Sequence, residues 1–417
     1  MTKPRLLVIS HVLPFPATSG QRQRVYYTLK ALKTQFHVTF LTVAPFSQHP
    51  SISENLHKIC DDVILLDSLY SKNRVSRIWH RGIAFFFSIV TGLKSSNYIT
   101  GKLEFSPKRV EKALENRSVD LVLFEYWHTA DLVPLFKKND IPCIIDTHNI
   151  LWQSYERQMQ MKRLPAFWKK RMVSHYRRRE EAAWTQFDGV IAINAAEYEY
   201  MKSRLPDSVW LTYVPMGIDL RLWSDPWEPA DPPRIAYYGG LGSVHNQQDA
   251  LTVYHQIMPL VWEKYPQAEL WIIGSNPPAT IQALSKDDKR VTVTGFVERV
   301  QDVLRTISIV VIPWSGTYGF RSRIVEVMAL GIPVITTPDA VYGMNLTPQE
   351  GLFMETSEQA MGHRVLELLD DPQELHVLSQ KARQQVERQY SFEASYYKMA
   401  TELLNHILPE LRSDSRR

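Results

Sequence analysis

Cysteine is scarce in this chain of 417 residues. Only Cys60 and Cys143 are present, far apart in the sequence, which argues against a disulfide framework and fits a reducing compartment. Long apolar runs are also lacking. The most apolar segment, residues 82–93 (GIAFFFSIVTGL), is shorter than the roughly 20 residues that a helix needs to cross a bilayer. No spanning helix is therefore predicted.

Several chemical signatures are missing as well. The sequence has no clustered Cys/His set, no HExxH, no P-loop and no G-x-S-x-G elbow, so no metal site is expected. The net charge of +4 permits an anionic ligand, and without a recognition motif we expect no nucleic acid as partner. The N-terminus leads almost directly into a strand-like run without the features of a signal peptide, so a cytoplasmic protein is expected.

What is present is an alternation of short apolar runs and helical stretches. Continuously apolar runs suit strands that are buried on both faces of a parallel sheet. In the first half they lie at 5–10, 37–43, 62–66, 119–124, 142–146 and 189–193, with helices expected at 21–35 and 106–116 among others. In the second half they lie at 234–239, 268–274, 290–294, 308–312 and 332–337, with helices at 246–264, 298–305, 322–330, 357–368, 372–389 and 393–408. The fold class is α/β.

The two halves are separated by residues 224–233 (SDPWEPADPP), which carry four prolines and predict a stiff extended linker. A chain of this length is also too long for one ordinary core. Two doubly wound α/β domains are therefore expected, over residues 1–223 and 234–389.

The segment 319–337 (GFRSRIVEVMALGIPVITT) combines a loop, a helix and a strand. Ser322 is expected to cap the helix, and Gly331 to end it. Ligands of open α/β sheets bind where helices begin beyond the carboxyl ends of strands, and a helix N-terminus suits a phosphate. Arg321 and Arg323 add forked donors there. Glu326 either holds two vicinal hydroxyls of a ribose or pairs with Arg323 as a solvated surface contact.

The segment 319–343 resembles the donor-binding segment of glycosyltransferase family 4, a retaining, nucleotide-sugar-dependent family with the two-domain GT-B fold. Three more stretches resemble the family in the right order: 14–24 (PFPATSGQRQR), 214–219 (VPMGID) and 237–250 (YYGGLGSVHNQQDA). The sequence departs from the pattern at Tyr318, where many members have a glutamate. A second departure is Met216, where asparagine is usual.

The resemblance implies two Rossmann-like domains that face each other across a cleft, with a C-terminal helix at about 390–417 crossing back to the N-terminal domain. It also implies a donor site in the C-terminal domain. The donor-binding residues it suggests are Gly239, Gly240, Gly274, Phe296, Val297, Arg321, Arg323 and Glu326. Arg323 and Glu326 are also expected to be catalytic, and no cofactor is expected besides the nucleoside diphosphate sugar as co-substrate.

The N-terminal domain holds a second candidate in residues 144–158 (IIDTHNILWQSYERQ). Asp146, His148 and Asn149 follow a predicted buried strand, and the resemblance places His148 near the transferred sugar as a catalytic and acceptor-side residue. The alternative is a capping cluster in which Asp146 or Thr147 begins the next helix. His11 is as readily a satisfied loop histidine as a ligand.

Two residues near the N-terminus complete the expected acceptor side. Gly20 permits a close backbone approach, and Arg24 is expected in the first turn of the following helix, facing the cleft. The alternative for this pair is an ordinary turn glycine and a solvated arginine.

Two basic tracts contain no acidic residue. Residues 157–179 hold nine Lys/Arg, and residues 72–94 hold five around IAFFFSIV. Both suit an anionic membrane surface. The alternative is a solvated helix face and a buried hydrophobic loop, and the buried loop is preferred for 82–93.

The sequence thus predicts a metal-independent, retaining glycosyltransferase that moves a sugar from a nucleoside diphosphate sugar to an acceptor hydroxyl in polysaccharide or glycolipid synthesis. The acceptor is a glycan, a lipid-linked glycan or a small molecule. The protein is expected in the cytoplasm, with a peripheral position on the inner face of the membrane as a further expectation. The alternatives are a non-catalytic nucleotide-binding partner subunit, or an epimerase or phosphorylase on the same fold.

Overall fold

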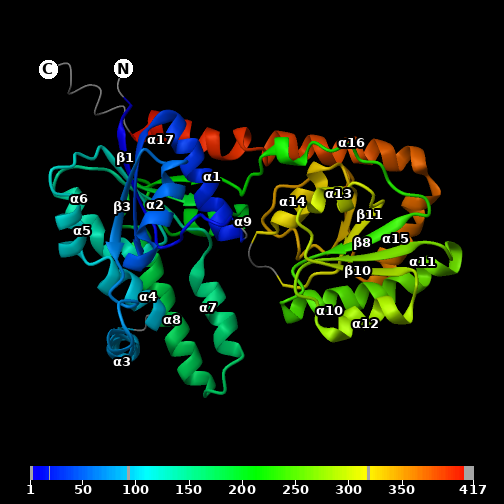
Figure 1. Cartoon of the computed structure of the whole chain (residues 1–417), viewed down its shortest axis with the longest axis horizontal. Coiled ribbons are helices and arrows are strands. Elements are labelled where there is room, and N and C mark those ends of the chain that lie inside the picture. Colours follow the sequence, from blue (N-terminus) through cyan, green and yellow to red (C-terminus); the bar gives the residue numbers. More distant parts are fainter. Residues whose placement is uncertain (1–2, 18, 92–93, 317–319, 408–417) are drawn as a thin grey trace. The chain divides into compact units, whose positions relative to one another are not determined.

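The computed structural model describes residues 3–17, 19–91, 94–316 and 320–407. Its contacts divide the chain into two compact units, each built on one parallel sheet (Figure 1). Unit 1 comprises the described residues up to Pro215 together with those from Tyr396 onward, and unit 2 comprises Met216–Ser395. The chain therefore returns to unit 1 for its last described helix.

The sheet of unit 1 has seven strands in the order β3-β2-β1-β4-β5-β6-β7. Strands β1, β4, β5 and β6 are buried along nearly their whole length, which is why their sequences are continuously apolar. The strands are β1 (Arg5–Ile9), β2 (His37–Ala44), β3 (Asp62–Asp67), β4 (Leu121–Glu125), β5 (Cys143–Asp146), β6 (Gly189–Ala192) and β7 (Trp210–Tyr213).

Helices cover this sheet. They are α1 (Gly20–Gln35), α2 (His49–His57), α3 (Arg74–Thr91), α4 (Ser95–Tyr98), α5 (Pro107–Ala113), α6 (Val133–Lys137), α7 (Leu151–Gln160), α8 (Ala166–Trp184), α9 (Ala195–Lys202) and α17 (Lys398–Ile407). The last of these, α17, packs against α1, and just before it the ring of Tyr396 stacks on Tyr27 with centroids 5.6 Å apart. Both contacts lie within unit 1.

The sheet of unit 2 has six strands in the order β10-β9-β8-β11-β12-β13, all parallel. They are β8 (Arg234–Tyr238), β9 (Glu269–Ile273), β10 (Val291–Gly295), β11 (Ile309–Ile312), β12 (Val334–Thr336) and β13 (Leu352–Met354). The helices are α10 (Val244–Thr252), α11 (Met258–Lys264), α12 (Ala279–Asp287), α13 (Val300–Leu304), α14 (Ser322–Ala329), α15 (Glu358–Asp370) and α16 (Pro372–Gln389). Separate apolar clusters on its two faces make this a sheet covered by helices on both sides.

Short 3-10 or π-helical segments complete the described elements. They are Phe46–Gln48, Ile99–Glu104, Trp127–Leu132, Leu220–Trp223, Val253–Ile257 and Glu393–Tyr397. The π-helical turn at Val253–Ile257 separates α10 from α11. One continuous helix had been expected there, over 246–264.

All eleven predicted strands are present, and the α/β fold class is confirmed. Strands β7 and β13 were not predicted. Each lies at an edge of its sheet, β7 is only half-buried and β13 has three residues, so neither produces a long apolar run.

Three local predictions are wrong. Residues 224–233, predicted as a stiff extended linker between the domains, lie within unit 2, where Trp227 Nε1 donates a hydrogen bond to Ile307 O at 2.7 Å and Glu228 N donates to Arg305 O at 2.9 Å. The cap position of α14 is held by Arg321, and Ser322 is already helical. Residues 82–91 form the second half of α3 instead of a buried loop, with the side chain of Phe86 63% exposed.

Candidate functional site

A cavity of about 280 Å³ lies in unit 2 beyond the carboxyl ends of β8 and β11, where α14 begins. That edge is where parallel α/β sheets bind ligands. The lining residues come from β8 and its following loop, from α10, and from the segment before and into α14. They are Tyr237, Tyr238, Gly239, Ser243, Asn246, Ile312, Trp314, Phe320, Arg321, Ser322, Arg323 and Ile324.

Both predicted arginines line this cavity, and each guanidinium packs on an aromatic ring. Arg321 Cζ lies 3.6 Å from the centroid of Trp314, and Arg323 Cζ lies 4.3 Å from that of Tyr238. Stacking holds a planar guanidinium in place without neutralising its charge. The positive end of the α14 dipole adds to the same potential. The cavity is therefore suited to an anion.

Glu326 lies one turn into α14 and is 8% exposed. The hydroxyl of Tyr238 donates a hydrogen bond of 2.8 Å to Glu326 Oε2. Burial, and then the neighbouring charge of Glu326, raise the pKa of Tyr238 well above its ordinary value, so this hydroxyl stays a donor. Glu326 is thus a buried acceptor positioned by an aromatic neighbour that lines the cavity, and the solvated surface contact considered for it is not what the structure has.

The predicted glycines lie at the same edge of the sheet. Gly239 lines the cavity, and a Cβ placed on Gly240 would lie 3.9 Å from Arg323 Nη2. A Cβ on Gly274 would lie only 1.8 Å from the carbonyl oxygen of Gly239, so the backbone after β9 approaches the backbone after β8 more closely than any side chain permits. Phe296 is 78% exposed and Val297 is half-buried. Neither of these two is among the residues that line the cavity.

Asp249 on α10 adds a titratable group next to these arginines. Burial raises the pKa of this carboxyl to about 7, and the charge of Arg321 opposes that shift. Burial and then the charge of Asp249 raise the pKa of the Tyr237 hydroxyl, which lines the cavity. The net charge beside Arg321 therefore changes near neutral pH.

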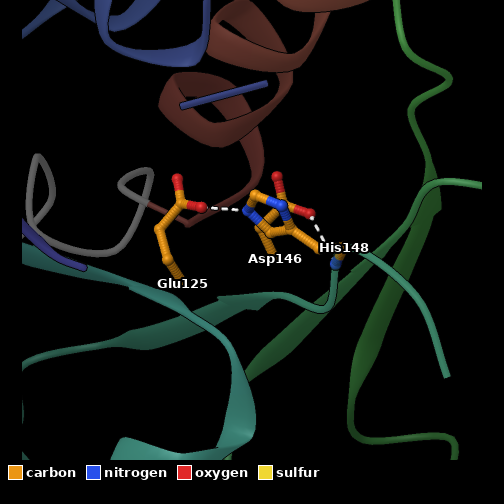
Figure 2. Close-up of side chains that lie close together, drawn as sticks. All are labelled: Glu125, Asp146 and His148. Atoms are coloured by element: carbon orange, nitrogen blue, oxygen red, sulfur yellow. Dashed lines mark hydrogen bonds and ion pairs between the residues drawn. The ribbon is translucent and has the colours of Figure 1, made fainter. Parts of the chain in front are cut away.

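A second polar cluster lies in unit 1, at the carboxyl ends of neighbouring strands. Glu125 ends β4, Asp146 ends β5, and His148 follows two residues later with a left-handed φ of 56°. Figure 2 shows His148 Nε2 bonded to Glu125 Oε2, and the backbone N–H of His148 donating to Asp146 Oδ1 at 3.4 Å. Arg24 completes the cluster from α1.

This cluster is almost completely removed from solvent: Arg24, Glu125 and Asp146 are 0% exposed and His148 is 2% exposed. Arg24 Nε donates to Asp146 Oδ2 at 2.8 Å, and Arg24 Nη1 donates to the carbonyl oxygens of Val214 and Pro215. Burial alone would raise the pKa of Asp146, but Arg24 and His148 hold it below its ordinary value. Asp146 is therefore a charged partner of Arg24.

The ring of Tyr126 stacks on His148 with centroids 4.4 Å apart. The carboxylate of Glu125 and this ring fix the imidazole from two directions. Glu125 Oε1 and Arg24 Nη2 have no hydrogen-bond partner among the described residues.

Glu125, Asp146 and His148 each offer one ligand atom, and these atoms lie within 4.8 Å of one another, the spacing of a metal site. The guanidinium of Arg24 already occupies Asp146 Oδ2, and His148 Nε2 already faces Glu125. A divalent ion would have to displace both contacts. The donor set as arranged fits an ion-pair network better than a metal centre.

The remaining predicted residues lie around this cluster. Gly20 is exposed at the start of α1, and Arg24 lies in the second turn instead of the first. Asn149 is half-buried. His11 is exposed, with its ring 5.0 Å from Tyr126. Tyr318, a departure from the family pattern, lies outside the described residues.

The sequence reasoning missed Glu125, Tyr238, Trp314 and Asp249. For Glu125 a signal existed, since a carboxylate directly follows the apolar run of β4. For the two aromatic residues no comparable signal existed, because aromatic residues in a strand or after it are usually core. Asp249 becomes relevant only through its tertiary proximity to Arg321.

Comparison with known proteins agrees with this geometry. Residues 232–371 match the family model described as Glycosyl transferases group 1. A curated mannosyltransferase from Corynebacterium glutamicum, GDP-mannose-dependent and acting on monoacylated phosphatidylinositol monomannoside, is 26% identical over 234 residues. That match covers 50% of this chain and 60% of the relative's length.

Solved structures extend the likeness over nearly the whole chain. Sucrose-phosphate synthase from Thermosynechococcus elongatus superposes with a TM-score of 0.66 at 17% identity, over 99% of this chain and 100% of that one. Anabaena HepE in complex with UDP and glucose superposes with a TM-score of 0.59 at 12% identity, over 96% and 99%. These likenesses show the fold, which is that of GT-B proteins.

The two parallel α/β units thus have the GT-B fold. Within this fold, residues 232–371 are the part of the chain that is similar to the Glycosyl transferases group 1 family. The resemblance to glycosyltransferase family 4 is thereby confirmed.

Proposed function

We propose that this protein is a glycosyltransferase that moves a sugar from a nucleoside diphosphate sugar to an acceptor hydroxyl. The observation that carries the proposal is the cavity at the start of α14, where Arg321 and Arg323 are both stacked on aromatic rings and both line the space. In this proposal the cavity takes the diphosphate of the donor, and Glu326 accepts hydrogen bonds from the ribose.

The proposed catalysis rests on stabilising the negative charge that develops on the leaving diphosphate. When the bond between the sugar C1 and the diphosphate oxygen breaks, that oxygen carries a growing negative charge. Donors that are already oriented stabilise this charge more strongly than they stabilise the bound substrate, and that difference lowers the barrier. Arg321, Arg323 and the helix dipole supply this stabilisation, so the proposed reaction is metal-independent. Retention of anomeric configuration is part of the proposal on family grounds.

On the acceptor side, the proposal gives His148 a role near the transferred sugar. Glu125 bonds to His148 Nε2, which leaves Nδ1 as the ring nitrogen for another partner. A buried carboxylate at one nitrogen fixes the orientation of the ring. Glu125 is then a positioning residue, and Gly20, Arg24 and Asn149 complete the acceptor side.

The relatives support this substrate class without identifying the substrate. HepE was solved with UDP and glucose, and the corynebacterial relative uses GDP-mannose and a lipid acceptor. A nucleotide-sugar donor and a glycan or lipid-linked acceptor are the corresponding proposals for this chain. A role in polysaccharide or glycolipid synthesis follows from them.

Calorimetric titration with UDP and with GDP, without added metal, tests the donor site. We expect the wild type to bind one of the two, and Glu326→Ala to weaken that binding by at least about tenfold, the effect of losing hydrogen bonds to a charged group. Tyr238→Phe separates positioning from direct contact, because it removes the hydroxyl that donates to Glu326 and keeps the carboxylate. Arg299→Ala is the control, since Arg299 is an exposed arginine of unit 2 that does not line the cavity.

The outcomes have different meanings. Nucleotide binding that disappears in Glu326→Ala and persists in Arg299→Ala supports the donor site. If the wild type binds neither nucleotide, the enzyme proposal is overturned and a partner subunit becomes the leading alternative. Binding followed by conversion of the donor sugar without transfer to an acceptor would favour an epimerase.

A further inference from the structure

Helix α3 (Arg74–Thr91) exposes a row of large apolar side chains in unit 1. Val75, Ile78, Trp79, Phe85 and Phe86 are each between 63% and 76% exposed. Their spacing of three, four and seven residues or multiples puts them on one face of the helix, while Ala84 on the opposite face is fully buried. A helix that faces its own core would have the reverse arrangement.

The turn between α7 and α8 carries a second exposed apolar group. Met161 and Leu164 lie in the turn, and Phe167 and Trp168 begin α8, with exposed fractions from 42% to 78%. Figure 1 shows this helix pair extending away from the sheet on the same side of unit 1 as α3. We call these two groups together the α3/α7–α8 surface.

Hydrogen bonds connect the regions of unit 1 that carry the two apolar groups. Lys94 Nζ, just after α3, donates to Gln158 Oε1 of α7 at 2.8 Å. Asn97 Nδ2 of α4 donates to the hydroxyl of Tyr176 on α8 at 2.7 Å. Both contacts hold the segment that follows α3 against the α7–α8 pair.

Positive charge surrounds the apolar side chains. Residues 72–94 contain five Lys/Arg and residues 157–179 contain nine, and neither stretch contains a carboxylate. Exposed cations include Arg74, Arg77 and Arg81 beside the α3 row, and Lys170 and Arg171 beside the α7–α8 turn. A partner of this surface must accommodate both the exposed aromatic rings and the unbalanced positive charge.

A second copy of the surface would bring like charges together, and nucleic acid offers nothing to receive a row of aliphatic and aromatic side chains. An anionic bilayer suits both features, because the apolar row enters the acyl boundary while the arginines and lysines contact headgroup phosphates. None of the helices that the structure describes is long and apolar enough to cross a membrane. We propose that the α3/α7–α8 surface binds peripherally to an anionic phospholipid bilayer. This proposal does not depend on the donor chemistry.

Co-sedimentation with vesicles tests it, using phosphatidylcholine alone and phosphatidylcholine mixed with phosphatidylglycerol. We expect the full-length protein to partition onto the mixed vesicles and much less onto the neutral ones, with binding that falls as salt rises. Trp79→Ser/Phe86→Ser and Phe167→Ser/Trp168→Ser each remove two inserted rings, so each is expected to weaken partitioning by at least about tenfold.

The controls keep the result interpretable. All four rings are at least 55% exposed, so these variants should keep the wild-type melting temperature. Val377→Ser on α16 removes a 49% exposed side chain of unit 2 and should partition like the wild type. Equal partitioning of the wild type and both double variants would overturn the proposal. So would a wild type that ignores vesicles and forms a dimer that the double variants lose.

Discussion

The carboxyl edges of the two sheets both bring arginine close to carboxylates, but the arginines have opposite surroundings. In unit 1 the guanidinium of Arg24 is fully buried and paired with Asp146, and its neighbours are main-chain carbonyls. In unit 2 Arg321 and Arg323 lie on aromatic rings at the wall of a cavity. In the first arrangement the arginine charge is paired inside the protein, and in the second it lies at a cavity wall.

This difference separates an arginine that is paired inside the protein from an arginine that lines a cavity. A buried guanidinium needs a carboxylate partner, because an unpaired charge in the interior is very costly. Stacking on a ring fixes the position of an arginine without neutralising it. Arg24 is therefore held in place by its ion pair with Asp146, whereas Arg321 and Arg323 are held by aromatic rings at the cavity.

The largest expected effect comes from breaking the buried pair. Arg24→Met should lower the free energy of unfolding by about 3–5 kcal/mol, because Asp146 would be left as an uncompensated buried charge. The measurement is urea unfolding followed by circular dichroism. Arg24→Met/Asp146→Asn removes both charges and should recover most of the loss. A single variant within about 1 kcal/mol of the wild type would contradict the buried-charge interpretation.

Substitution of the cavity arginines should affect ligand binding more than it affects the free energy of unfolding. Arg321→Ala and Arg323→Ala are each expected to weaken nucleoside diphosphate binding by about 10- to 100-fold, since each removes charge-assisted hydrogen bonds worth about 1.5–3 kcal/mol. Their unfolding free energies should change much less than that of Arg24→Met. Titration calorimetry with Arg299→Ala as control provides the test, and an unchanged affinity in both cavity variants would refute the assignment.

The smallest effect is a dependence of binding on pH. Burial places the pKa of Asp249 at about 7, above its ordinary value, so this carboxyl is protonated in acid and its negative charge appears as the pH rises through 7. That charge competes for Arg321, and we expect diphosphate affinity to fall by about two- to fivefold between pH 6 and pH 8.

Asp249→Asn should abolish this part of the dependence and leave only the ionisation of the diphosphate itself. The ratio of the two dissociation constants across the pH range isolates the carboxyl. A ratio that stays constant with pH would show that Asp249 does not act on the site.

The sequence was sufficient for the strands in the interior of the sheets because strands buried on both faces are continuously apolar, as in β4 and β11, but it missed the edge strands β7 and β13. It also placed Arg321, Arg323 and Glu326 together, because they share one helix start. It could not supply Tyr238 as the donor to Glu326, since the two residues are far apart in sequence and meet only through the packing of α14 on β8. For Arg24 it suggested a residue that faces a cleft, whereas tertiary packing buries the side chain against Asp146.

The segment 82–93 shows a limit of a different kind. An apolar run ordinarily indicates burial, and the exposure of Phe85 and Phe86 on α3 could be recognised only once the buried side of the helix was known. Exposure depends on what covers a helix, and a linear sequence does not contain that information.

The close approach of the backbone at Gly274 to the carbonyl of Gly239 also has a consequence for mutational tolerance. Every other amino acid adds at least a Cβ atom, and here that atom would collide with main chain that cannot move without separating β8 from β9. In a saturation scan, position 274 should therefore tolerate nothing but glycine, like a residue that contacts substrate. Such a scan would therefore rank Gly274 with the functionally essential positions, although its sensitivity comes from the space that a Cβ atom would need.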